Sequence, residues 1–251
     1  MRLTIVGCSG SYPGPESSAS CYLVEEEYEG RTWRIVLDLG SGALGQLHRY
    51  VDPLDVDAVF LSHLHADHCL DMCGYYVLRK YKPGGPAARI PVWGPAGTAE
   101  RMAAAYDLPV DPGMTEEFDF REHAAPVELG PFRVVTRRVA HPVPAYALRV
   151  VAHGRTLVYT GDTGPCAAVD EIAVGADVLL AEASFEESRE NPADLHLTGA
   201  ECGEIATRAG VGGLVLTHVP PWHDPQVVMD EARRTFTGPL SLATPGARFE
   251  I

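Results

Sequence analysis

The sequence predicts an α/β sandwich in which two packed mixed sheets carry helices on their outer faces. Strand-like and helix-like segments alternate along the 251 residues instead of forming one block of each type, and such alternation is typical of α/β layer folds. Residues 59–63 (VFLSH) and 214–218 (LVLTH) both lead an apolar strand into a hydroxyl residue and a histidine, which indicates two related halves. Since no linker separates these halves, we expect one domain spanning residues 1–251.

The individual elements follow from apolar and β-branched runs, from turn residues and from helix-start signals. Strands are expected near 2–6, 20–26, 33–38, 57–61, 132–139, 146–151, 155–160, 177–181, 213–217 and 239–242. Helices are expected near 41–51, 67–81, 97–106, 166–174, 198–209 and 224–236. The segment Thr198-Gly-Ala-Glu201 resembles a capping box at the start of one of these helices.

Composition and charge narrow the classes of partner. The chain enters its first expected strand without a signal peptide, and no apolar run approaches the roughly 18 residues of a membrane span. We therefore expect a cytoplasmic protein with no membrane contact. The 20 basic and 34 acidic residues give a net charge of -14, which repels a polyanion at long range. A long nucleic acid is disfavoured as a partner, whereas a small anion held by a metal is not.

The segment 61–69 (LSHLHADHC) packs four potential metal ligands into six positions. In an extended chain alternate side chains share a face, so His63, His65 and Asp67 can converge while His68 follows on the first helical turn. Imidazole and carboxylate suit zinc, manganese or iron better than calcium. Cys69 adjoins the motif, but its neighbours already supply enough ligands, and the six cysteines form no C-x-x-C pair.

Three further strand ends offer ligands for a second metal. His141, Asp162 and His218 each follow an apolar run directly, as expected for a site built on strand ends over a rigid core. Each residue taken alone is also compatible with an ordinary turn. Together with the six-residue motif they predict a binuclear site.

These residues resemble, in order and spacing, the metallo-β-lactamase-fold hydrolases across nearly the whole chain. The resemblance implies a four-layer αβ/βα sandwich that holds two divalent metal ions, with zinc as the first candidate and manganese or iron as alternatives. It assigns His63, His65 and His141 to the first metal, Asp67, His68 and His218 to the second, and Asp162 to a bridge between them. By the same resemblance, Asp38 would steady the loop that carries the ligands.

Several segments resemble the phosphodiesterase branch of this family, which includes tRNA 3′-end endonucleases. They are 7–15 (GCSGSYPGP), 182–184 (EAS), 196–198 (HLT) and 217–221 (THVPP). In that branch His196 would lie near the scissile phosphate, oriented by Glu182. The endonucleases carry a long tRNA-binding arm between the positions equivalent to His141 and Asp162, whereas only twenty residues separate them here. That segment reads as two strands around a turn at 153–154, so we expect the arm to be missing.

The same motifs are most similar to a group of actinobacterial proteins described as atypical class II-like cyclic-AMP phosphodiesterases. The expected activity is therefore hydrolysis of a small cyclic nucleotide, such as 3′,5′-cyclic AMP, by metal-bound hydroxide that Asp67 orients. Two alternatives remain open: an RNA-processing endonuclease of the tRNA 3′-end type and a non-catalytic metal-binding protein. A homodimer is the family-like expectation, and no heptad or other sequence feature supports it.

The remaining polar and aromatic residues carry weaker expectations. Ser17 and Ser18, in the serine-rich loop 9–20, are the candidate substrate contacts. Three aromatic residues are potential base-stacking groups that are more often found in the core: Trp93, Trp222 and Tyr76. Three histidines without partner ligands are expected at the surface: His48, His123 and His153. A fourth, His223, is expected to have a structural role outside the metal set.

Overall fold

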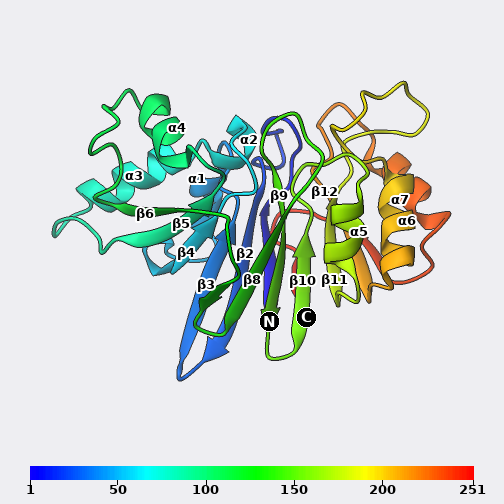
Figure 1. The fold of residues 1–251 in the computed structure, drawn as a ribbon, viewed down its shortest axis with the longest axis horizontal. Coiled ribbons are helices and arrows are strands. Elements are labelled where there is room, and N and C mark those ends of the chain that lie inside the picture. Colours follow the sequence, from blue (N-terminus) through cyan, green and yellow to red (C-terminus); the bar gives the residue numbers. More distant parts are fainter.

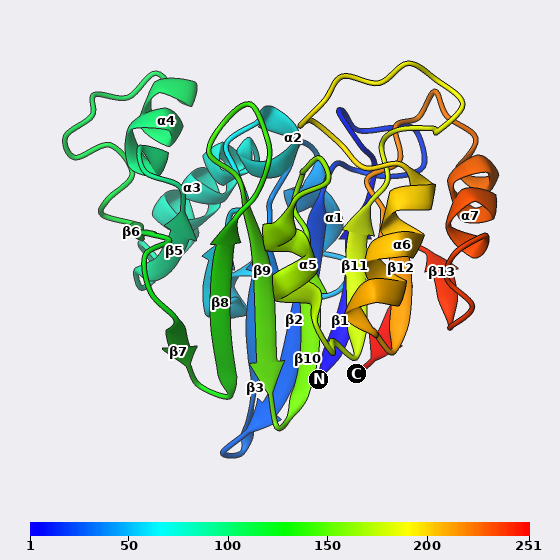
Figure 2. The same cartoon turned by 45° about the vertical axis from the view of Figure 1, so that its right-hand side comes forward.

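Two seven-stranded sheets pack face to face, and helices cover the outer face of each (Figure 1). The computed structural model describes residues 1–251. Helices α1–α4 lie on one side of the sheets and α5–α7 on the other (Figure 1). The turned view brings the half with α6 and α7 forward (Figure 2). The predicted α/β sandwich is confirmed. None of the helices is both long and apolar enough to cross a membrane.

The first sheet is antiparallel at one edge and parallel at the other. From β14 to β3 neighbouring strands run antiparallel, and from β3 to β6 they run parallel. The strands, in sheet order, are β14 (Arg248–Glu250), β1 (Arg2–Gly7), β2 (Cys21–Tyr28), β3 (Arg31–Leu37), β4 (Ala58–Phe60), β5 (Ile90–Gly94) and β6 (Phe118–Glu122). The helices of this half are α1 (Ala43–Leu47), η1 (Pro53–Asp55), α2 (Ala66–Cys69), α3 (Met72–Tyr81) and α4 (Thr98–Ala105).

The second sheet also combines an antiparallel part with a parallel part. Strands β7 to β10 form an antiparallel meander, and β10 to β13 run parallel. The strands, in sheet order, are β13 (Leu240–Leu242), β12 (Gly213–Thr217), β11 (Val178–Glu182), β10 (Arg155–Tyr159), β9 (Tyr146–Ala152), β8 (Phe132–Arg138) and β7 (Val127–Leu129). The helices are α5 (Ala167–Ala173), α6 (Gly199–Ala209) and α7 (Pro225–Arg233). Thr198 and Glu201 form the predicted capping box of α6.

Three apolar clusters hold the four layers together. One lies between the sheets and includes Leu3, Ile5, Phe132 and Leu148. The other two lie under the helices of each half. Each fully buried aliphatic or aromatic side chain contributes about 1.5–3 kcal/mol. The two-residue period of the strands explains the division, because in β1 Ile5 faces the opposite sheet and Val6 faces the helices.

The structure differs from the predicted elements in two ways. The expected helix 67–81 is broken at Leu70–Asp71 into α2 and α3, because the Asp71 amide donates to the Leu39 carbonyl at 3.1 Å and not to the preceding helical turn. The Asp71 carboxylate accepts from the amides of Gly42 and Leu44. Four strands were not predicted: β5, β6, β7 and β14. They are edge-proximal and short or charged, so they lack the apolar alternation that identifies a strand from sequence.

Candidate metal centre

Seven histidine and aspartate side chains converge at one end of the two sheets. His63, His65, Asp67 and His68 leave β4 and enter α2, while His141, Asp162 and His218 follow β8, β10 and β12. The structure brings all seven sequence-predicted ligands into two neighbouring groups. Parallel strands deliver their carboxyl ends to one edge of a sheet, so residues far apart in sequence meet there.

The first group consists of three imidazole nitrogens. His63 Nε2 lies 3.0 Å from His65 Nδ1, which lies 3.3 Å from His141 Nε2. Tetrahedral zinc with Zn–N bonds of about 2.0–2.1 Å places its ligand nitrogens about 3.3 Å apart. The three nitrogens are therefore spaced as ligands of one ion. His65 is exposed and His141 half-buried, so this side of the centre opens to solvent.

The second group is buried and contains two carboxylates. His218 Nε2 lies 3.1 Å from both His68 Nε2 and Asp67 Oδ2. Asp162 Oδ1 lies 3.2 Å from His68 Nε2, and Asp162 Oδ2 lies 3.8 Å from His63 Nε2. Asp162 thus extends one oxygen toward each group, which is the arrangement that a bridging carboxylate requires.

The donor atoms fit divalent metal ions. Asp162 Oδ1 is buried and has no hydrogen-bond donor, and a buried carboxylate oxygen without a partner is costly unless a cation compensates it. Burial lowers the pKa of His63 well below its usual value and so favours the neutral form that binds metal. Although burial opposes charge on His68, Asp162 and Asp38 raise its pKa well above the usual value. The carboxylates therefore favour a positive charge at this position.

Outward hydrogen bonds aim the ligand nitrogens at the centre. The Nδ1 atom of His141 donates to the Leu195 carbonyl at 2.9 Å. His63 and His218 donate through Nδ1 to serine hydroxyls that themselves donate to other oxygens. Each Nε2 is thereby left unprotonated and pointing at the site, which is how outer hydrogen bonds fix the tautomer of a metal-binding histidine.

Asp38 is the hub of this outer network. Its carboxylate is fully buried and accepts from the Ser62 amide (2.6 Å) and hydroxyl (2.7 Å), from His68 Nδ1 (2.7 Å) and from the Tyr159 hydroxyl (2.7 Å). Asp38 follows β3 with a φ of 58°, a left-handed conformation that is uncommon outside glycine and is found at functional sites. Two residues later, a Cβ on Gly40 would lie 1.9 Å from the Asp67 carbonyl. Only glycine permits this close approach of the ligand-bearing loop.

His196 lies at the rim of the centre and is held by Glu182. The buried Glu182 carboxylate accepts from His196 Nδ1 (3.0 Å), from the Thr163 amide (3.0 Å) and from the Ser184 amide (3.0 Å). The His196 ring lies 5.7 Å from that of His218 between centroids. Burial opposes protonation of His196, but the charge of Glu182 raises its pKa to about 9. The His196 ring therefore faces the ligand cluster with a pKa above the usual value of a histidine.

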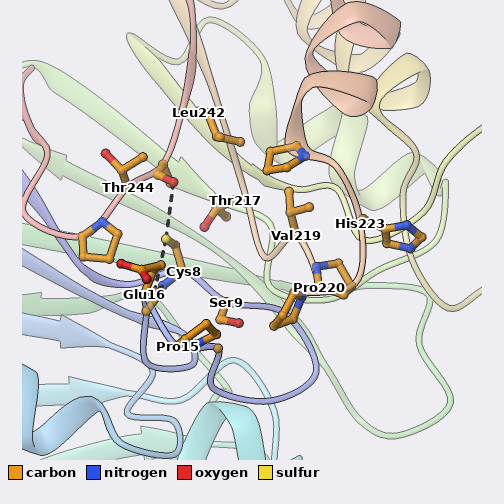
Figure 3. A pocket seen from close by; sticks show the side chains of 16 residues that line it. Cys8, Ser9, Pro15, Glu16, Thr217, Val219, Pro220, His223, Leu242 and Thr244 are labelled. Atoms are coloured by element: carbon orange, nitrogen blue, oxygen red, sulfur yellow. Dashed lines mark hydrogen bonds between the residues drawn. The ribbon is translucent and has the colours of Figure 1, made fainter.

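The two predicted substrate contacts, Ser17 and Ser18, lie in the loop 9–20, outside both ligand groups. The Ser17 hydroxyl accepts from the Cys8 amide at 3.0 Å and donates to the Ser18 carbonyl. Ser17 lines a cavity of about 320 Å³ between the loop that carries Cys8, Ser9 and Pro15 and the segment that carries Thr217, Val219, Pro220 and His223 (Figure 3). The lining of this cavity includes none of the seven ligands. The structure therefore does not bring Ser17 into the metal centre.

Several expectations for single residues are corrected by their surroundings. His123 was expected at the surface but is half-buried and donates through Nε2 to the Leu61 carbonyl at 2.8 Å, next to the ligand segment. Trp222 was expected in the core but is exposed, whereas Trp93 and Tyr76 are buried as expected. His223 pairs with Glu186 at 2.7 Å, outside the ligand groups.

Sequence reasoning missed the residues that support the ligands. Ser62 and Tyr159 bind Asp38, Ser184 binds His218, and the Ser11 amide lies 3.5 Å from His218 Nε2. Ser62 had a usable signal, because it directly precedes His63 at a strand end. Tyr159 had none, since a tyrosine in an apolar strand is usually a core residue.

Residues 33–219 match the family model described as the β-lactamase superfamily domain. The chain belongs to this superfamily. It is 44% identical over 257 residues to Rv1339 of Mycobacterium tuberculosis, covering 100% of this chain and 92% of that protein. It is also 29% identical to YhfI of Bacillus subtilis, described as a probable metallo-hydrolase, over 100% of both proteins.

Solved structures agree with this assignment. The crystal structure of YhfI has a TM-score of 0.88 and covers 100% of this chain and 99% of its own. The human tRNase Z short form shares the fold, with a TM-score of 0.75 at 20% identity over 100% of this chain and 99% of its own. The protein is thus a metallo-β-lactamase-fold hydrolase with a histidine and aspartate cluster able to bind metal.

Proposed function

We propose that this hydrolase is a binuclear phosphodiesterase that acts on a small cyclic nucleotide such as 3′,5′-cyclic AMP. One observation carries the proposal: Asp162 lies between the two ligand groups, with one oxygen near His68 and the other near His63, and His196 lies beside them with its ring bonded to the buried Glu182. A phosphodiester in hydrolysis must have charge neutralised on its phosphoryl oxygens and a proton delivered to its leaving oxygen. The ligand groups and His196 supply these two functions side by side.

The ligand groups divide the metal binding between them. His63, His65 and His141 would hold one divalent ion, and Asp67, His68 and His218 would hold the other, with Asp162 between the two. Zinc is the first candidate, and manganese or iron would accept the same donor atoms. When bound, such ions supply Lewis-acid catalysis by activating water and neutralising phosphoryl charge.

The protein side chains orient and protonate the reactants. Asp67 would accept a hydrogen bond from the attacking water through the carboxylate oxygen that does not contact His218. His196 would donate through Nε2 to the phosphate or to the leaving alkoxide, because its Nδ1 is bonded to Glu182. Glu182 acts only through His196, as a positioning residue. Ser17 and Ser18 stay candidates for an indirect part in substrate binding, through the shape of their loop.

The size of the substrate is argued from the segment between His141 and Asp162. This segment forms β9 and β10, joined by a turn at 153–154, so the chain carries no arm at the position where the endonucleases have one. The net charge of -14 also repels a long polyanion. Both observations favour a small phosphodiester over RNA, and we place the activity in the cytoplasm, where cyclic nucleotides occur.

The first test is hydrolysis of 3′,5′-cyclic AMP by purified, metal-analysed protein, followed by release of 5′-AMP. Asp67→Ala is assayed alongside, and Asp230→Ala, an exposed aspartate on α7, serves as the matched control. Turnover that is lost only in Asp67→Ala supports the proposal. Absence of turnover by wild-type protein with two metals bound rejects cyclic AMP as the substrate.

The second candidate is an RNA-processing endonuclease, favoured by the shared His196 and Glu182 motifs and by the fold of tRNase Z. A precursor tRNA with a 3′ trailer distinguishes it from the first, since only an endonuclease releases the trailer. Metal-dependent turnover of either substrate excludes the third alternative, a non-catalytic metal-binding protein.

A further inference from the structure

Two large aromatic side chains lie against each other in solvent, on loops that contact or follow His218. Tyr12 is 44% exposed and Trp222 is 59% exposed, and their ring centroids lie 5.3 Å apart with an interplanar angle of 31°. Large aromatic side chains usually bury most of their surface, so an exposed pair marks a binding site more often than a lone exposed ring does. We refer to these two residues as the Tyr12–Trp222 pair.

The pair is fixed to the ligand cluster through His218. The amide of Ser11, directly before Tyr12, lies 3.5 Å from the Nε2 atom of His218. The Gly10 amide donates to the Val219 carbonyl at 3.2 Å, and a Cβ on Gly10 would lie 2.1 Å from the His218 carbonyl oxygen. The loop that carries Tyr12 therefore packs directly on the residue that follows β12 and contributes a ligand nitrogen.

Both loops are held in place by local hydrogen bonds. The Ser9 hydroxyl donates to the Tyr12 carbonyl at 2.7 Å. On the other loop, His223 pairs with Glu186 through Nδ1 at 2.7 Å and its amide donates to the Pro220 carbonyl at 3.0 Å. Figure 3 shows Ser9 and Pro220 facing each other where these loops meet. The aromatic rings are thus presented by a preformed surface, which lowers the entropy cost of binding a ligand.

We propose that the Tyr12–Trp222 pair is the base-binding platform of this phosphodiesterase and determines its preference for substrates that carry a planar nucleobase. The inference rests on the proposed function, because it assumes that the phosphate lies at the ligand cluster. A cyclic nucleotide has one phosphate and one base. With the phosphate held near His218, the base extends over the adjacent loops, where every nucleobase can stack on an aromatic ring.

The test measures binding separately from turnover. Wild-type protein, Trp222→Ala and Trp222→Phe are titrated by calorimetry with 5′-AMP and with ribose 5-phosphate, which carries the same phosphate without a base. Tyr81→Ala, a substitution of an exposed aromatic at the end of α3, is the matched control. We expect Trp222→Ala to weaken 5′-AMP binding about tenfold relative to ribose 5-phosphate, equivalent to about 1.4 kcal/mol. Trp222→Phe restores most of the loss.

The same variants are then assayed with cyclic AMP, where KM should rise about tenfold in Trp222→Ala with a smaller change in kcat. Equal losses of affinity for 5′-AMP and ribose 5-phosphate, or no loss for either, overturn the proposal. If 5′-AMP binding falls as expected but wild-type protein does not hydrolyse cyclic AMP, the platform stands and the proposed substrate is rejected. If cyclic AMP is hydrolysed equally by all variants, the proposed function stands and the platform is rejected.

Discussion

The ligand cluster and its rim, which the Tyr12–Trp222 pair forms, differ in burial and in how their side chains are held. His63, His68 and His218 are fully buried, and each has a ring nitrogen fixed by an outward hydrogen bond. Tyr12 and Trp222 lie on two loops that contact His218 or follow it, and both side chains are exposed, with their rings against each other. On the proposed function, the cluster would determine which reaction is possible, and the Tyr12–Trp222 pair would determine which molecule is bound.

The two regions differ in how much free energy a substitution in each would cost. A buried charged group must have every partner in place, so a change in the cluster affects metal binding, stability and turnover together. A rim residue faces water, and its loss costs only its own contact with the substrate. Substitutions in the cluster should therefore act on all substrates alike, and substitutions in the rim should act on some more than others.

The strongest way to break the cluster is Asp162→Asn. The substituted amide keeps the shape of the side chain but cannot bridge two cations, so we expect metal content to fall below two ions and turnover to fall at least about a thousandfold, as after the loss of a catalytic group. Metal content is measured by mass spectrometry and turnover with cyclic AMP. Asp230→Asn on α7 is the matched control, and two ions retained by Asp162→Asn would contradict the bridging role.

Loss of metal should also be visible without any substrate. An ion present at a hundred times its Kd stabilises the fold by about 2.7 kcal/mol, which raises Tm by about 5–10 °C in a domain of this size. Chelation of wild-type protein should therefore lower Tm by that amount, whereas Asp162→Asn should respond much less. An equal response of the two proteins would show that Asp162 contributes little to metal binding.

His196 stands between the two regions, and His196→Ala should separate chemistry from metal binding. Since His196 is not among the predicted ligands, we expect kcat to fall by about a hundredfold or more while metal content stays unchanged. Steady-state kinetics and metal content are measured on the same preparation. Normal hydrolysis by the variant, or loss of its metal, would remove the proton-donor role.

The sequence predicted the candidate ligands better than the residues that hydrogen-bond and position them. All seven candidate ligands could be found because four lie within six residues and the other three directly follow apolar strands. The tyrosine partner of Asp38 could not, because Tyr159 reaches it from the opposite sheet, across 121 residues of sequence. The strands β5 and β6 were missed for a similar reason. Their place in the sheet depends on pairing with distant neighbours, which leaves little local pattern.

Tyr159→Phe tests the buried hydrogen bonds to Asp38 that support the ligand cluster. It removes one donor to Asp38 and should weaken metal binding about tenfold, the lower range for partners of metal-binding histidines. Tyr22→Phe is the matched control, because Tyr22 packs against Tyr159 at 4.8 Å but bonds Thr217 instead of Asp38. Metal affinity is measured by competition with a chelator of known affinity. If both variants lose metal equally, the effect comes from packing and not from the Asp38 network.

The smallest effect is expected from Ser17 and Ser18, which lie in the loop 9–20 and belong to neither ligand group. The Ser17 hydroxyl is already bonded to the Cys8 amide, and the Ser18 hydroxyl is buried without a partner. Ser17→Ala should lower the free energy of unfolding by about 1 kcal/mol through the lost bond, whereas Ser18→Ala should cost little. Neither variant should change KM for cyclic AMP more than about threefold, a range set by about 0.6 kcal/mol. A tenfold rise in KM without a loss of stability would instead make these serines direct substrate contacts, and the rim would then extend deeper than the aromatic pair.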